Sequence, residues 1–99
     1  MTYRITFHNK ALSEWNSLDK GVRIRLAKTL EKRQANPHVR SAALSADLSG
    51  CYVVRVSKTG HRVVYRVDEY EKVLKIVSVG KRADKAAYRA AILRILDSE

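Results

Sequence analysis

Several features that define common protein classes are scarce or absent in this sequence. It has one cysteine, Cys51, so no disulfide can form within the chain. No apolar run approaches the roughly 20 residues of a membrane-spanning helix. The first residues, MTYRITFHNK, lack the pattern of a secretory signal peptide. We therefore expect a cytoplasmic protein with no membrane partner.

The sequence also lacks the patterns of metal sites and of common catalytic centres. His8, His38 and His61 lie far apart, with no second type of ligand at metal-binding spacing, so we expect no metal and no other cofactor. The acidic residues are scattered, and no serine or cysteine nucleophile signature is present. Gly80-Lys81-Arg82 resembles part of a phosphate-binding loop, but the further glycines and the hydroxyl after the lysine are missing. Cys51 opens an apolar strand, which predicts a small buried side chain.

Positive charge is abundant. The chain carries 20 lysines and arginines against 10 aspartates and glutamates, a formal net charge of +10. Such an excess repels itself in a compact molecule and is typical of proteins that bind a polyanion. Nucleic acid is the leading candidate, and an acidic protein or a membrane surface are the alternatives that composition leaves open.

The chain has the length and the apolar content of one folded domain. It has 99 residues, of which 45% are hydrophobic, so we expect one domain over residues 1–99 with a single core. Apolar periodicity predicts the order βααβββα, an α+β domain with a small, mostly antiparallel sheet flanked by two N-terminal helices and one C-terminal helix. The predicted strands are 2–7, 52–56, 62–67 and 72–79, and the predicted helices are about 9–18, 20–34 and 86–96. Residues 38–50 lack a clear period and are predicted to be a loop.

The same periodicity predicts which side chains are buried. On the first strand they alternate, and on the helices they recur at helical spacing. Asp84 is a possible cap of the last helix. The residues expected to face the core are Tyr3, Ile5, Phe7, Ala11, Leu12, Trp15, Leu18, Val22, Leu26, Leu30, Tyr88, Ala91, Ile92 and Ile95, with Ala87 and Leu93 beside them.

The stretch CYVVRVSKTGHRVVYRV, residues 51–67, is typical of a β-hairpin. If residues 57–60 form the turn, Val56 pairs with His61 and Arg55 lies opposite Arg62. Like charges at opposed positions destabilise a sheet. The pair makes sense if an anion lies between the two guanidinium groups, and the alternative is that both project into water and diverge.

Cations and one phenol are predicted to gather near one edge of the sheet. An arginine fork matches the oxygens of a phosphate, and an aromatic ring can stack on an unpaired base. The alternative for Tyr88, the tyrosine of the last helix, is that its ring packs in the core and does not contact a base. The residues of this group are Arg55, Lys58, Arg62, Arg66, Lys81, Arg82 and Tyr88. A further basic stripe on the second helix, Arg25, Lys28 and Lys32, either follows phosphates or is a solvated helix face.

These motifs resemble a known family. The segments ALSEWNSL, CYVVRVSKTGHRVVYRV and VSVGKRADKAAYRAAILRIL, which span nearly the whole chain, are similar to those of RelE-type toxins of bacterial toxin–antitoxin pairs. The resemblance implies a compact sheet flanked by helices and an endonuclease that cuts messenger RNA in the ribosomal A site. In that reaction the ribose 2′-OH is the nucleophile, and the products are a 2′,3′-cyclic phosphate and a 5′-OH. The implied partners are the ribosome, a RelB-like antitoxin and, through their complex, operator DNA.

The resemblance also implies roles for individual residues. Arg62 would stabilise charge on the phosphorane, Arg82 would contact the phosphate or assist the leaving 5′ oxygen, and Tyr88 would stack on a base and orient the 2′-OH. The best-known member has two lysines where this chain has Val53 and Arg55, and a guanidinium does not lose its proton. Three explanations stay open. The proton acceptor is ribosomal RNA or a substrate oxygen, or it is a lysine such as Lys58 or Lys81. In the third, which we favour, the chemistry rests almost wholly on geometry and charge, with Arg55 as a phosphate clamp.

Two other functions compete with this one. A toxin resembling the ParE branch of the same fold would poison DNA gyrase without nuclease activity. A plain basic RNA-binding module would have no activity at all. A ParE-like toxin would not need two arginines and a tyrosine at one site, and a plain RNA-binding module would keep its affinity in Tyr88→Phe and leave no product ends.

Overall fold

The computed structural model describes residues 2–56, 58–81 and 86–97. Within this part of the chain no helix is long and apolar enough to cross a membrane. The order of helices and strands is βααβββα, as the sequence predicts. The elements are β1 (Arg4–Phe7), α1 (Asn9–Asn16), α2 (Lys20–Ala35), β2 (Cys51–Val56), β3 (His61–Asp68), β4 (Val73–Lys81) and α3 (Ala86–Asp97).

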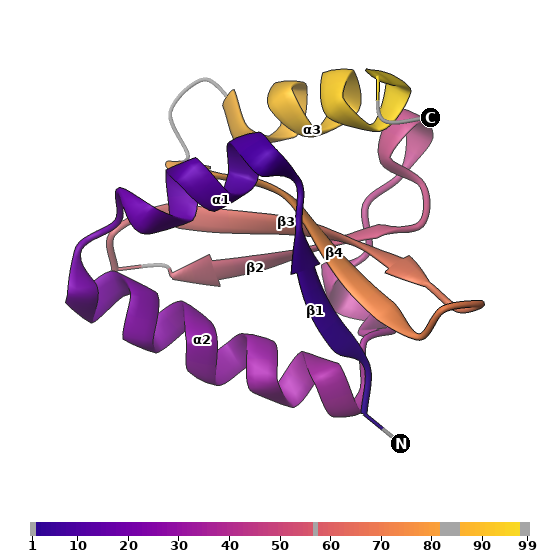
Figure 1. Cartoon of the computed structure of the whole chain (residues 1–99), viewed down its shortest axis with the longest axis horizontal. Coiled ribbons are helices and arrows are strands. Elements are labelled where there is room, and N and C mark those ends of the chain that lie inside the picture. Colours follow the sequence, from indigo (N-terminus) through magenta and orange to yellow (C-terminus); the bar gives the residue numbers. More distant parts are fainter. Residues whose placement is uncertain (1, 57, 82–85, 98–99) are drawn as a thin grey trace.

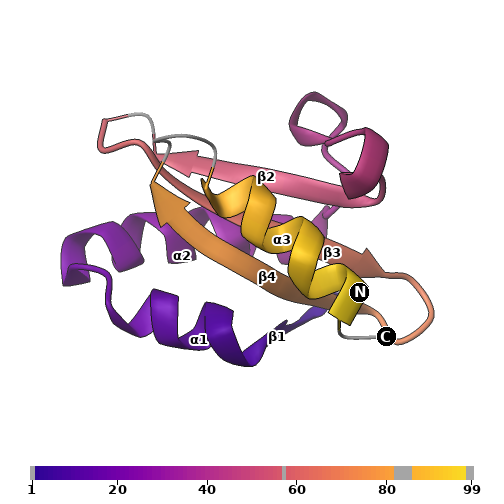
Figure 2. The same cartoon turned by 90° about the horizontal axis from the view of Figure 1, so that it is seen from above.

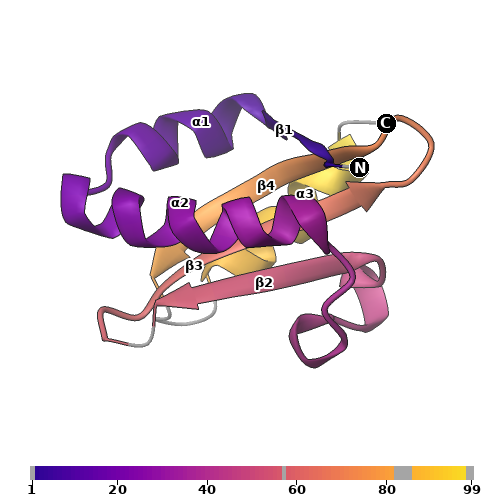
Figure 3. The same ribbon diagram turned by 90° about the horizontal axis from the view of Figure 1, so that it is seen from below.

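The strands form one sheet that is covered on both faces. Its order is β1-β4-β3-β2; the β2–β3 and β3–β4 pairs are antiparallel, and β1 is parallel to β4. The sheet is therefore mixed, although mostly antiparallel as predicted. The helices α1 and α2 lie on one face and α3 lies on the other (Figures 1, 2 and 3).

Alternation along β3 divides the core into two parts. Val63 and Tyr65 are fully buried on the face beneath α1 and α2, together with Leu26 and Leu30 of α2. Val64 is buried on the opposite face. There it meets the inner side of α3 in a second cluster, whose members are Leu48, Cys51, Val64, Val77 and Ala91, with Leu44, Tyr88, Ile92 and Ile95 packed against it.

Most of the predicted buried positions are confirmed, including Cys51 at 1% exposure. One is wrong: Leu12 is 44% exposed, because the short α1 turns Ala11 and Trp15, four residues apart, toward the sheet. Leu93, which the sequence places beside the buried face of the last helix, is 63% exposed, because it lies two residues, or about 200°, from the buried Ala91 on α3.

Several predicted boundaries also differ. The segment 38–50 contains two short 3₁₀ helices, η1 (Arg40–Ala42) and η2 (Ala46–Leu48), where a loop was predicted. β1 begins at Arg4, two residues later than predicted. β4 does not end before Gly80 but continues through Lys81, because Gly80 pairs with β3. The possible cap Asp84 lies outside the described residues.

A polar cluster around Glu69 joins several chain segments at the end of the sheet opposite the turn between β2 and β3. The Glu69 carboxylate accepts hydrogen bonds from the Tyr3 hydroxyl at 2.8 Å and from Lys72 Nζ at 3.3 Å, and it also contacts His38 Nε2. The other ring nitrogen of His38 lies 3.0 Å from the Tyr52 hydroxyl. The hydrogen bonds from His38 and Tyr3 are the main causes that lower the pKa of Glu69 to about 2.

His8 caps the N-terminus of α1. Its ring Nδ1 accepts a hydrogen bond from the backbone N–H of Lys10 at 3.1 Å, and the backbone N–H of His8 donates to the Ile76 carbonyl at 2.8 Å. Burial lowers the pKa of His8, and the nearby cations Arg94 and Lys75 lower it further. Only the neutral ring can accept the capping bond, so protonation removes the cap.

The first prediction concerns the pH dependence of stability. The folded pKa of His8 lies below its unfolded value of about 6.5. The contribution of His8 to the free energy of unfolding is therefore fully present above about pH 6.5 and is lost as the pH falls through the folded pKa. His8→Asn keeps a good N-cap and removes this titration. Urea unfolding at pH 7.5 and pH 5 should give a smaller loss for the variant than for the wild type. Equal losses in both proteins would refute the assignment.

Candidate nucleic-acid interface

The hairpin of β2 and β3 has the register that the sequence predicts. Val56 pairs with His61 and Arg55 pairs with Arg62. The Gly60 N–H donates to the Val56 carbonyl at 2.8 Å, and Gly60 has a positive φ of 79°, which glycine adopts without strain. The local turn therefore places both arginines on the α3 face of the sheet.

The side chain of Arg62 meets the phenol of Tyr88. Arg62 Nη1 donates to the Tyr88 hydroxyl at 2.6 Å, and the guanidinium carbon lies 5.5 Å from the ring centroid. Both side chains are half-buried, whereas Arg55 is exposed on the edge strand β2. The contact holds Arg62 toward α3. The two guanidinium groups of the cross-strand pair therefore have different surroundings, since Arg62 lies beside Tyr88 and Arg55 is exposed to solvent.

Small residues of β4 and α3 lie beside this contact. Gly80 is the β4 partner of Arg62, and a Cβ placed on it would lie 3.5 Å from the Ala87 Cβ. The Ser78 hydroxyl donates to the Ala87 carbonyl at 2.6 Å. The sequence interpretation missed Gly80, Ser78 and Ala87. Their only signal was their small size at the end of a strand and the beginning of a helix.

The hairpin itself carries no carboxylate that could neutralise Arg55 and Arg62. Residues 51–67 contain no aspartate or glutamate, and the three acids Asp68, Glu69 and Glu71 follow only at the opposite end of β3. At about 3.3 Å per residue, Asp68 lies about 20 Å along the strand from Arg62. The guanidinium groups of Arg55 and Arg62 are therefore available to an external anion.

The other cations of the predicted group are less closely placed. Arg66 is on the same face as Arg62 but about 13 Å farther along β3, where it pairs with Cys51 and Lys75. Lys81 pairs with His61, so alternation directs it to the opposite face. Lys58 is exposed in the hairpin turn. Arg82 lies outside the described residues.

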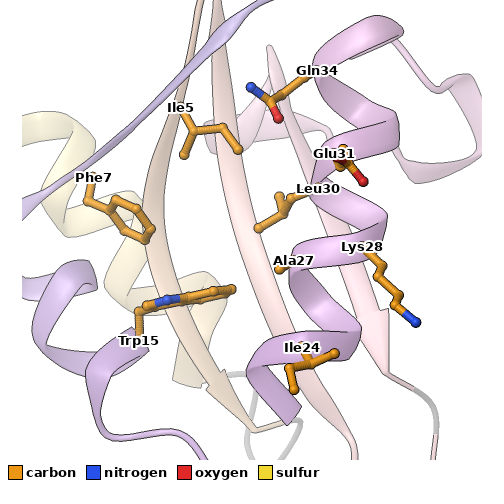
Figure 4. A pocket seen from close by; sticks show the side chains of 9 residues that line it. All are labelled: Ile5, Phe7, Trp15, Ile24, Ala27, Lys28, Leu30, Glu31 and Gln34. Atoms are coloured by element: carbon orange, nitrogen blue, oxygen red, sulfur yellow. The ribbon is translucent and has the colours of Figure 1, made fainter. Parts of the chain in front are cut away.

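The basic stripe of α2 belongs to another surface. Arg25, Lys28 and Lys32 are all exposed on the helix that covers the face opposite Tyr88. Beside it, between α2 and the segment of β1 and α1, lies an apolar groove of about 540 Å³ (Figure 4). This groove is lined by Ile5, Phe7, Trp15, Ile24, Ala27, Lys28, Leu30, Glu31 and Gln34. Because its charged residues are one lysine and one glutamate, the groove does not match a phosphate, and the surface around Arg62 is the better candidate for an anion site.

Comparisons with known proteins agree on the family. The family model described as the ParE toxin of the type II toxin–antitoxin system parDE matches residues 5–86. The mRNA interferase toxin RelE of Escherichia coli K12 is 34% identical over 96 residues, which cover 97% of this chain and 100% of that protein. The chain belongs to the RelE-type toxins.

Solved structures of this family share the fold. An arginine-substituted mutant of E. coli RelE in the free state has a TM-score of 0.88 at 33% identity, covering 96% of this chain and 99% of that chain. The toxin in the intact E. coli RelBE toxin–antitoxin complex has a TM-score of 0.77 at 33% identity, covering 80% and 95% of the two chains. The fold predicted for this RelE-type toxin is thereby confirmed.

The geometry of the site predicts how RNA binding depends on salt. Each phosphate contact to single-stranded RNA adds about 0.7 to the slope of log K against log salt. Arg62→Ala should reduce the slope measured with a short RNA by about this amount, because one contact is lost. Arg4→Ala, which removes an exposed cation on the opposite edge strand β1, is the matched control and should leave the slope unchanged. Equal slopes for wild type and Arg62→Ala would place the phosphate elsewhere.

Proposed function

We propose that this RelE-type toxin is a ribosome-dependent endoribonuclease that cuts messenger RNA in the ribosomal A site and so stops translation. The hydrogen bond between Arg62 and Tyr88 carries the proposal, because it places a phosphate-binding group beside a ring that can stack on a base. The name of the full-length relative, an mRNA interferase, supports the same activity.

The proposed reaction is an in-line transfer within the RNA. The 2′ oxygen of one ribose attacks the adjacent phosphorus, and the bond from phosphorus to the 5′ oxygen breaks. The 2′-OH proton passes to an acceptor, and the leaving 5′ oxygen takes up a proton. The products are a 2′,3′-cyclic phosphate and a 5′-OH, and the reaction needs no metal or organic cofactor.

The proposed roles of Arg62, Arg55 and Tyr88 are supported by charge and position, and that of Arg82 rests on the resemblance to RelE-type toxins. Arg62 stabilises the negative charge that develops on phosphorus, and Arg55, exposed across the hairpin, clamps a phosphate. Tyr88 stacks on a base and orients the 2′-OH. Arg82 contacts the phosphate or assists the leaving oxygen. Farther from this centre, the proposed RNA-binding cations are Lys58 in the turn, Arg66 along β3 and Lys81 on the opposite face, and on α2 Arg25, Lys28 and Lys32.

The side chains offer little that can accept the proton. Val53 is buried at 2% exposure, and the guanidinium of Arg55 stays protonated. Lys81 faces away from Arg62, so of these two lysines Lys58 in the turn is the better alternative. We propose that alignment and charge supply most of the acceleration, since fixing the reacting groups can contribute several kcal/mol.

The proposed partners are those of a toxin of this family. A RelB-like antitoxin with an acidic, flexible segment neutralises the +10 charge of the chain. Its complex with the toxin binds operator DNA. The ribosome supplies both the messenger and a negatively charged cleft in the cytoplasm, so we expect docking to weaken strongly with salt.

The deciding experiment maps the messenger on programmed ribosomes by primer extension. Wild type should cut within the A-site codon. Arg62→Ala should lower the single-turnover rate by about 10²–10³-fold, the usual effect of losing one donor to a developing charge. Lys58→Ala and Lys81→Ala should change it much less. Absence of any A-site cut would reject the function, and a larger loss for Lys58→Ala than for Arg62→Ala would make that lysine the base.

The match to the ParE model over residues 5–86 favours a second candidate, a gyrase inhibitor without nuclease activity. Such a toxin does not need the contact between Arg62 and Tyr88. A supercoiling assay with purified gyrase separates the two, because an endoribonuclease leaves supercoiling unchanged at concentrations that stop translation.

A further inference from the structure

The strand β4 extends beyond its neighbour β1 and leaves part of one edge without a strand partner. β1 pairs with β4 only as far as Phe7 and Ile76, and the last bond from this side runs from the His8 N–H to the Ile76 carbonyl at 2.8 Å. β4 continues to Lys81. Backbone groups on such an edge must find other partners when they are covered by protein.

One ion pair supplies those partners. Glu14 of α1 accepts the Val79 N–H at 3.0 Å, and Arg94 of α3 donates to the Val77 carbonyl, also at 3.0 Å. Arg94 Nη1 and Nη2 also bind the two carboxylate oxygens of Glu14 at 2.7 and 2.8 Å. The side chain of Arg94 is 12% exposed and that of Glu14 is 34% exposed. Residues 80 positions apart in the sequence thus close the edge of β4 together.

The protonation states of the pair suit this role. Burial raises the pKa of the Glu14 carboxyl, but the hydrogen bonds from Arg94 and from the Val79 N–H outweigh burial, and the net pKa is lowered. The hydrogen bond to Glu14 raises the pKa of Arg94. Both groups therefore stay charged at neutral pH, and two parallel bonds between an arginine and a carboxylate restrict the orientation of both side chains.

The segment held by the pair also supports the RNA site. Ser78 lies between the two clamped backbone groups and donates to the Ala87 carbonyl at 2.6 Å. Gly80 follows and pairs with Arg62. Tyr88 is the next residue after Ala87 and accepts from Arg62. Figure 2 shows α3 lying along this part of the sheet. The ion pair thus binds the edge of residues 77–79 of β4, and the first turn of α3 packs on one face of the same segment.

We propose that Glu14 and Arg94 are positioning residues of the RNA site. Neither contacts the phosphate; they hold α3 against β4 so that the Tyr88 hydroxyl meets Arg62. The proposal rests on the proposed ribonuclease function for its kinetic consequence, but its structural consequence stands apart from that function.

The test uses the full chain and two substitutions of Arg94. Arg94→Gln removes the charge and the paired bonds, and Arg94→Lys keeps the charge with less exact geometry. On programmed ribosomes we expect Arg94→Gln to lower the saturating single-turnover rate about 10- to 100-fold, as misplacing a catalytic group does, with an unchanged concentration for half-saturation. Arg94→Lys should recover part of the rate.

A second readout does not depend on activity. In protein labelled with ¹³C-tyrosine, the Tyr88 ring signal, identified by its loss in Tyr88→Phe, should shift in Arg94→Gln because the contact with Arg62 is disturbed. Glu69→Gln is the matched control, since it breaks the polar cluster at the far end of β3. It should lower the melting temperature without moving the Tyr88 signal or the rate.

The outcomes separate the possibilities. A wild-type rate and an unmoved Tyr88 signal in Arg94→Gln would overturn the proposal, as would a loss of rate no greater than that of Glu69→Gln. If Arg94→Gln does not fold, the same comparison is made with Arg94→Lys, and a wild-type rate and signal there overturn it. If the wild type itself cuts no messenger, the proposed function fails, and the Tyr88 signal alone decides whether the pair positions the ring.

Discussion

The register of β3 is the constraint on which the rest of the molecule depends. Val63 and Tyr65 are buried on one face of this strand while Val64 is buried on the other, so the strand is enclosed from both sides. A slip of one residue would move Arg62 to the face beneath α2 and exchange the side chains that form the two cores. The large cost of burying an unpaired guanidinium opposes such a slip. The apolar packing of the sheet therefore also fixes where the charged group of the proposed site emerges.

Tyr65 shows how strongly this register is held. Its ring is fully buried beneath α2, and its hydroxyl donates to the Pro37 carbonyl at 2.9 Å and accepts from Arg33 at 2.9 Å. Arg33 also donates to the Val53 carbonyl on the neighbouring strand at 3.3 Å. A polar group buried with its partners satisfied in this way allows one arrangement of strand, helix and loop and disfavours others.

The distribution of charge along the sheet follows from the same arrangement. Beside Arg62 the hairpin has no acid, while Asp68, Glu69 and Glu71 gather at the far end of β3. There Glu69 is already satisfied by Tyr3, His38 and Lys72. The end beside the hairpin turn, where the hairpin carries no acid, can bind a polyanion, and the other end ties the first strand to the rest of the sheet.

Much of this protein was determined by local sequence. Runs of β-branched and aromatic residues on either side of a four-residue turn predicted the hairpin and the opposition of Arg55 and Arg62, because a turn fixes the register of the strands that it joins. Helical spacing likewise predicted the buried face of α2. The parallel pairing of β1 with β4, the exposure of Leu12, the seating of Tyr88 on Arg62 and the bond between Glu14 and Arg94 were decided only by the tertiary structure. They join segments far apart in the chain, and their geometry depends on how whole elements pack, which no local pattern of residues encodes.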